Sequence, residues 1–132
     1  MLIYYDNSKK IIGYNMHTIK KEFHFSSAHQ LYGLPDCHPC SRLHGHNYIL
    51  TVYLKGELDK IGFVQDYREL DDIKKYVDDV LDHRNLNDIF PAHNTTVENM
   101  TKLIYDYFKP KHPLLIAVEM SETPKTNCRY EP

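Results

Sequence analysis

Two histidines and a cysteine lie close together in the segment Cys40-Ser-Arg-Leu-His44-Gly-His46, and His29 precedes His44 by fifteen residues. Residues at alternate positions of a strand point to the same face, so His44 and His46 can bind one ion together. Zinc accepts imidazole nitrogens readily, and catalytic sites use three protein ligands with one position left open. The spacing predicts a zinc site made of His29, His44 and His46. Because His-x-His pairs are common, the alternative is unrelated strand histidines held by hydrogen bonds.

Cys40 adds a thiol beside the predicted metal. The charge of a metal ion lowers the pKa of a nearby thiol and favours the thiolate, so Cys40 could act as a general base, a nucleophile or a fourth ligand. Cys37 and Cys40 also have the C-x-x-C spacing of redox motifs. Pro35 and Pro39 nevertheless predict a loop, not the strand and helix that flank such motifs. We interpret Cys37 and Cys128 as buried, inert cysteines.

Asp82 and His83 end a predicted helix and could transfer protons together if a turn brings both into one cleft. Adjacent helical positions do not face each other, so the pair could instead meet groups from another subunit. A histidine favoured by the dipole at a helix C-terminus is the equal alternative.

Glu122 extends an apolar strand face, where a carboxylate is rare without a partner. A ligand with paired N–H donors, such as a guanidine-like heterocycle edge, would satisfy it, and a solvated strand end is the alternative. Thr96 and Glu98 carry a weaker signal, because helix capping explains both.

Composition limits the class of protein. The chain has 132 residues, which predicts a single domain, with 42% hydrophobic and 26% charged residues as in soluble globular proteins. The formal net charge is −2, so a nucleic-acid partner is not indicated. The longest apolar run, Leu114 to Val118, is too short for a bilayer, and the N-terminus does not resemble a signal peptide. With three cysteines, an odd number, we expect a cytoplasmic protein.

Hydrophobic periodicity predicts the elements that position these residues. Strands are expected at 17–29, with Phe23, Phe25, Ser27 and His29 on one face, and at 44–55, separated by an irregular loop. A helix capped by Asp66 and a second one from Thr95 or Thr96 follow. The final strand is expected to bury Leu114, Ile116, Val118 and Met120, with Glu122 continuing that face. Residues 1–15 are predicted to be an N-terminal extension, such as a short hairpin, ahead of one domain at 16–132. The order predicts an antiparallel α+β sheet with both helices on one side.

Together these elements resemble the 6-pyruvoyl-tetrahydropterin synthase family, and within it the bacterial-type 6-carboxy-tetrahydropterin synthases. The matching motifs run in register through most of the chain: Phe25-Ser-Ser-Ala-His29, Cys40-x3-His44-Gly-His46, Gly62-Phe-Val-Gln-Asp66-Tyr67, Leu81-Asp82-His83-x2-Leu86-Asn87, Thr96-Val-Glu98-Asn99 and Glu122-Thr123. Thr95 departs from this pattern where proline is frequent. The resemblance implies a T-fold, a four-stranded antiparallel sheet with two helices on one face in the order ββααββ, whose trimers form a barrel and stack into a homohexamer.

The resemblance also implies residue roles. His29, His44 and His46 would bind Zn²⁺, and Cys40 would act with Asp82 and His83 of a neighbouring subunit in proton transfer. The substrate-binding residues would be Glu122, Thr123, Thr96 and Glu98, which would hold the aminopyrimidinone edge of a pterin.

The activity that the resemblance implies is a zinc-dependent lyase reaction on 7,8-dihydroneopterin triphosphate. The products would be 6-carboxy-tetrahydropterin, acetaldehyde and triphosphate, in queuosine-type 7-deazapurine biosynthesis. One alternative stops at 6-pyruvoyl-tetrahydropterin. An alternative of another class is a non-enzymatic, zinc-stabilised binding module, in which Cys40 would close the site as a fourth ligand.

Overall fold

The computed structural model describes the backbone of residues 2–5 and 10–13 and both backbone and side chains of residues 15–132. β1 (Leu2–Tyr5) and β2 (Lys10–Gly13) pair in antiparallel fashion, as expected for a hairpin. The connection between these two strands, residues 6–9, lies outside the described residues.

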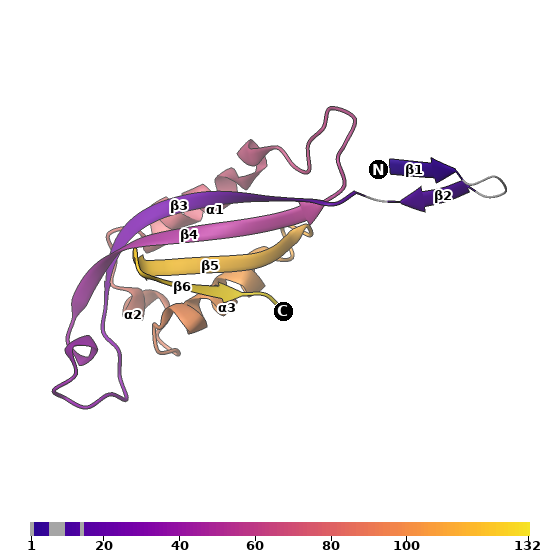
Figure 1. Ribbon diagram of the computed structural model, residues 1–132. Helices are drawn as coiled ribbons and strands as arrows, with labels where there is room; N and C mark the ends of the chain where they lie inside the picture. The colour runs from indigo at the N-terminus through magenta and orange to yellow at the C-terminus, as the bar shows by residue number, and fades with distance from the viewer. Residues whose placement is uncertain (1, 6–9, 14) are drawn as a thin grey trace.

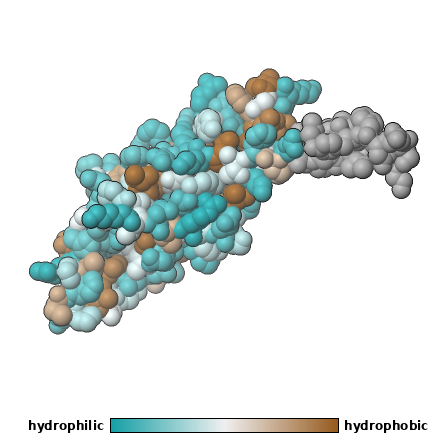
Figure 2. All heavy atoms as spheres, viewed as in Figure 1, coloured by the Kyte–Doolittle hydropathy of each residue, from teal (hydrophilic) through white to brown (hydrophobic). Residues whose placement is uncertain are grey.

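A four-stranded antiparallel sheet forms the body of the protein, in the order β3-β4-β5-β6 (Figure 1). The strands are β3 (His17–His29), β4 (His44–Gly56), β5 (Leu115–Thr123) and β6 (Thr126–Tyr130). Helices cover one face of the sheet, so the predicted α+β T-fold is confirmed. No helix of the described chain is both long and apolar enough to cross a membrane, and hydrophilic side chains predominate on the face in Figure 2.

The first helical segment begins as predicted at Asp66, whose side chain accepts a hydrogen bond from the Arg68 N–H. It comprises a 3-10 turn (Tyr67–Leu70), α1 (Asp71–Tyr76) and a π-helical turn (Val77–Leu81). α3 (Val97–Phe108) has Thr96 as its N-cap, which accepts from the Asn99 N–H. A short helix that the sequence did not predict, α2 (Leu86–Ile89), lies between them, and a 3-10 turn (Pro39–Ser41) interrupts the loop before β4.

The core lies between the sheet and these helices. Phe23, Phe25, Ser27 and His29 of β3 are all buried, so the predicted inward face is confirmed. The prediction for β5 was wrong in its first half: Leu115 is fully buried and Leu114 is 37% exposed. An irregularity opposite Tyr53 and Leu54 inserts one extra residue into β5, which shifts the alternation before Ala117.

Candidate metal centre and active site

His29, His44 and His46 converge at the end of the β3–β4 pair. Cα register places His29 opposite His44, and His46 follows two residues later on the same face. One side-chain nitrogen from each ring lies within 4.8 Å of the other two. The Nε2 atoms of His29 and His44 are 3.0 Å apart. The structure therefore brings together all three residues that the sequence predicted as metal ligands.

Backbone carbonyls fix the tautomers of two of these rings. The Nδ1–H of His29 donates to the Thr95 carbonyl at 2.8 Å, and the Nδ1–H of His44 donates to the Arg42 carbonyl at 2.7 Å. In the neutral rings both Nε2 atoms then carry lone pairs, so they cannot hydrogen-bond to each other across 3.0 Å. A cation between them would remove this repulsion, and carbonyl partners of this kind commonly orient metal-binding histidines.

His46 also presents a ring nitrogen that can bind a metal ion. Its Nε2 is buried and has no hydrogen-bond partner among the described residues. Burial lowers the pKa of His46 and of His29 below the ordinary value, although Glu122 acts in the opposite direction. Neutral imidazole is the form that binds metal, so the donor set fits a zinc ion.

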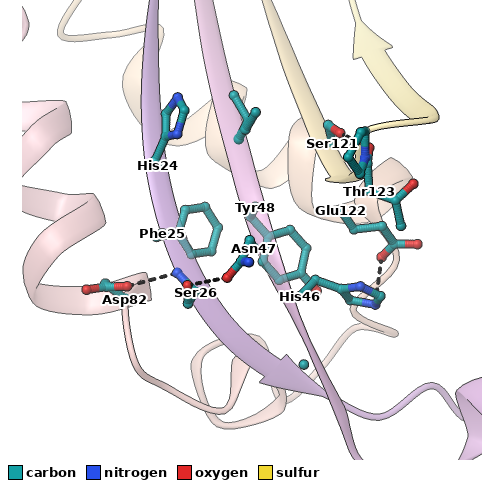
Figure 3. Close-up of a pocket in the computed structure, with 13 residues that line it drawn as sticks. His24, Phe25, Ser26, His46, Asn47, Tyr48, Asp82, Ser121, Glu122 and Thr123 are labelled. Atoms are coloured by element: carbon teal, nitrogen blue, oxygen red, sulfur yellow. Dashed lines mark hydrogen bonds and ion pairs between the residues drawn. The ribbon is translucent and has the colours of Figure 1, made fainter.

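Glu122 of β5 lies beside the triad. Its Oε2 is 3.6 Å from Nε2 of His46 and 3.8 Å from Nε2 of His29, and its side chain is 30% exposed (Figure 3). A pocket of about 740 Å³ opens between the ends of β3, β4 and β5. His46, Glu122, Thr123 and Asp82 all line it. A carboxylate at this depth can accept two N–H groups from a ligand that also reaches the histidines.

Asp82 and His83 face each other, contrary to the expectation for adjacent helical residues. His83 Nδ1 lies 2.8 Å from Asp82 Oδ2. The reason is that the helix ends at Leu81, Asp82 is extended, and His83 has a positive φ of 56°. The Ser26 N–H donates to Asp82 Oδ1 at 2.9 Å, and this bond, followed by that to His83, lowers the pKa of the Asp82 carboxyl. The carboxylate thus orients an imidazole that is itself 82% exposed.

Cys40 lies in the 3-10 turn Pro39–Ser41 and is half-buried. Among the described residues its thiol does not belong to the group of ligand atoms formed by the three histidines. The three-histidine group is thus not closed by a fourth cysteine ligand. Cys37 is exposed rather than buried, because it lies in the irregular loop, and Cys128 is half-buried with its Sγ 3.8 Å from the Thr101 hydroxyl.

The remaining predicted substrate residues separate into two groups. Thr123 lines the pocket, and its hydroxyl lies 3.0 Å from that of Thr126 in the turn between β5 and β6. Thr96 and Glu98 do not line this pocket. Thr96 is the N-cap of α3, as the alternative predicted, whereas Glu98 is exposed in the first turn of that helix and does not take the capping position.

Sequence reasoning missed the groups that orient the ligands. The carbonyls of Thr95 and Arg42 are backbone atoms and leave no residue-type signal. Tyr48 of β4 is a further neighbour that was not singled out: its ring contacts the His46 ring edge-on, with centroids 5.5 Å apart. The alternation of His44, His46 and Tyr48 on β4 could have revealed this neighbour.

The fold and the site define an α+β T-fold protein with a three-histidine centre of the metal-binding kind. The family model described as 6-pyruvoyl tetrahydropterin synthase matches residues 18–132. The chain belongs to this family of tetrahydropterin synthases.

Individual relatives agree with this assignment. The chain is 37% identical over 113 residues to a 6-pyruvoyl tetrahydrobiopterin synthase of Dictyostelium discoideum, covering 75% of this chain and 84% of the relative. It is 33% identical over 127 residues to a 6-carboxy-5,6,7,8-tetrahydropterin synthase of Bacillus subtilis, covering 86% and 84%. The solved structure of Caenorhabditis elegans 6-pyruvoyl tetrahydropterin synthase superposes with a TM-score of 0.80 at 30% identity, covering 92% of this chain and 99% of that one.

Proposed function

We propose that the protein is a zinc-dependent 6-carboxy-5,6,7,8-tetrahydropterin synthase that acts on 7,8-dihydroneopterin triphosphate. The observation that carries this proposal is the set of three histidine nitrogens beside the Glu122 carboxylate, in a pocket that Asp82 also lines. A pterin carries an amino-pyrimidinone edge with adjacent N–H donors, which matches a carboxylate acceptor. The similarity to the Bacillus subtilis synthase over 86% of the chain supports the same choice.

The residues take the following roles. His29, His44 and His46 hold the zinc ion, which when bound supplies Lewis-acid polarisation of the substrate's side-chain oxygens and so acidifies the adjacent C–H. Cys40 removes the proton as a thiolate, and His83, oriented by Asp82, returns protons to or takes them from those oxygens. Glu122 anchors the ring, with help from Thr123, Thr96 and Glu98.

The overall reaction needs no external reductant. The substrate side chain is oxidised while the dihydropterin ring is reduced to the tetrahydro level. With one water consumed, loss of triphosphate and C–C cleavage give 6-carboxy-tetrahydropterin and acetaldehyde. We place the product in 7-deazapurine biosynthesis of the queuosine type. We further propose that the protein is cytoplasmic, which three free cysteines support. We also propose that it forms a homohexamer, a dimer of trimers.

Two other functions are the alternatives to this proposal. A 6-pyruvoyl-tetrahydropterin synthase would use the same groups and stop after triphosphate loss, as the name of the Dictyostelium relative suggests for that protein. A zinc-stabilised binding module would need a closed four-ligand site, and the absence of the Cys40 thiol from the ligand group in the described chain argues against it.

The test combines metal analysis with product identification. Wild-type protein loaded with zinc is incubated with 7,8-dihydroneopterin triphosphate, and products are identified by mass spectrometry. We expect 6-carboxy-tetrahydropterin with equimolar acetaldehyde. His44→Ala should abolish zinc binding and turnover together, whereas His93→Ala, which removes an exposed histidine, should leave both unchanged. A 6-pyruvoyl product would select the first alternative, and full turnover by metal-free protein would refute the zinc mechanism.

A further inference from the structure

The segment that follows the first helix runs along the free edge of β3. One edge of β3 pairs with β4, and the opposite edge would otherwise be unpaired near the site. There the N–H of Ala28 donates to the Arg84 carbonyl at 2.9 Å, and the N–H of His83 donates to the Ser26 carbonyl at 2.7 Å. Ser26 and Ala28 are two residues apart, so their backbone groups point to the same edge of β3, and both find hydrogen-bond partners there.

Two asparagine side chains continue this pairing beyond the end of β3. Asn87 Oδ1 accepts from the Gln30 N–H at 2.8 Å, and its Nδ2 donates to the Gln30 carbonyl at 2.8 Å. Asn94 repeats the arrangement two residues later, with 3.1 Å to the Tyr32 N–H and 3.0 Å to its carbonyl. A primary amide carries a donor and an acceptor, as a peptide group does, so each side chain replaces one rung of a partner strand.

This short extension connects the metal ligand to the thiol loop. Gln30 directly follows His29. Leu31 lies between Gln30 and Tyr32 and directs its N–H to the opposite edge of the strand, where it donates to the Cys40 carbonyl at 3.0 Å. Asn94 also precedes Thr95, whose carbonyl orients the His29 ring. The segment Gln30–Tyr32 therefore connects the His29 side of the proposed reaction centre to the Cys40 side.

The backbone groups of Gln30 and Tyr32 do not need these two amides for stability. Gln30 is exposed and Tyr32 is 60% exposed, so water could satisfy their backbone groups at little cost. What water cannot supply is a fixed backbone direction. Small displacements of a ligand or a catalytic base from its productive position reduce rates strongly.

We propose that Asn87 and Asn94 are positioning residues that hold Gln30–Tyr32 as an extension of β3 and thereby fix His29 and the Cys40 turn relative to each other. The proposal rests on the proposed function where it invokes turnover. Its structural part, the placement of a ligand and a thiol, stands without it.

The test uses Asn87→Ala and Asn94→Ala in the full chain, with Asn127→Ala as matched control. Asn127 donates to Glu119 on the far strands, away from the triad. Asn87→Asp and Asn94→Asp provide variants of the same size that lose the donor to the carbonyl. Zinc affinity is measured by chelator competition well below the unfolding temperature. The rate of Cys40 alkylation by iodoacetamide is followed by peptide mass spectrometry, with Cys37 as the internal reference.

We expect zinc affinity to fall in the Asn87 variants, by at most the about 10- to 100-fold that loss of an outer-shell partner causes, because Asn87 acts on His29 through the Gln30 backbone. Alkylation of Cys40 should accelerate in the variants of both asparagines while that of Cys37 does not change. With substrate, kcat should fall and KM should change little, because Glu122 on β5 is untouched. Wild-type zinc affinity and Cys40 reactivity in folded variants would overturn the proposal. Failure of all four variants to fold would also overturn it, since the amides would then serve the fold. Wild-type protein without synthase activity would refute the proposed function, while the zinc and alkylation measurements would still decide this one.

Discussion

Tyr48 carries a hydroxyl group that is buried without a hydrogen-bond partner among the described residues. The residue is 1% exposed, and its ring stacks on Phe25 with centroids 5.0 Å apart and an interplanar angle of 10°. The same ring contacts His29 and His46 edge-on. Burial raises the pKa of the Tyr48 hydroxyl far above its ordinary value, and Glu122 acts in the same direction, so the group keeps its proton throughout the physiological range.

Tyr48→Phe keeps every ring contact and removes only the unpaired oxygen. A buried polar group without a partner costs about 1–3 kcal/mol. We take the lower end because the adjoining pocket is open to solvent, so the free energy of unfolding of the metal-free protein should rise by about 1 kcal/mol. For a chain of this size that corresponds to a Tm increase of roughly 3–5 °C. The direction is unusual, since most core substitutions destabilise.

The assay is urea unfolding of chelator-treated protein at one fixed protein concentration, because association would shift the apparent stability. Tyr105→Phe is the matched control. Its hydroxyl is also in a buried residue but donates to the Leu115 carbonyl at 3.4 Å, so its removal should lower stability by up to about 1 kcal/mol. If Tyr48→Phe loses as much stability as Tyr105→Phe, the Tyr48 hydroxyl has a partner in solution and the reasoning fails.

Three further outcomes are expected. Mixing unfolded His44→Ala and His83→Ala chains and refolding them together should restore about a quarter of wild-type activity if the exposed His83 ring serves a neighbouring subunit, and none if it serves its own chain. Glu122→Gln should weaken substrate binding about 10- to 100-fold, as expected for a lost charge-assisted pair, with zinc affinity retained; an unchanged KM would contradict the anchoring role. His112→Ala should lower the free energy of unfolding by about 1–3 kcal/mol, because the buried Nε2 of His112 lies 2.8 Å from the Asp72 carboxylate. Zinc affinity should not change in this variant, and a drop in it would show that the His112–Asp72 pair is coupled to the site.

Local sequence patterns were sufficient to predict the buried face of β3 and the helix caps. Alternation identified the buried side of β3, and the oxygen-bearing side chains of Asp66 and Thr96 marked the starts of the helical segments. It failed at β5, where an extra residue opposite Tyr53 and Leu54 puts Leu115 in the core in place of Leu114. A β-bulge depends on how two distant strands align, and no window within β5 contains that information.

The candidate site, too, could be predicted from the sequence only in part. The pairing of His29 with His44 could be anticipated, because two adjacent strands ending in histidines on their inward faces must bring them together. The mutual contact of Asp82 and His83 could be predicted only on the condition of a turn, since it depends on the left-handed backbone of His83, which the local sequence pattern does not specify. The groups that set the histidine tautomers are carbonyls, which every residue type carries equally.

The separation of Cys40 from the histidines matters for the chemistry. Both polar backbone atoms of Cys40 are engaged, its N–H with the His38 Nδ1 at 3.1 Å and its carbonyl with the Leu31 N–H at 3.0 Å. These two bonds therefore fix the backbone of Cys40, while its Sγ lies outside the ligand group. A thiolate bound to zinc would be a weak base, because its lone pairs would be shared with the metal. If zinc binds to the three histidines, a loop that holds Cys40 apart from them would leave one coordination position open and would leave the thiol available as a base, and the proposed reaction requires both.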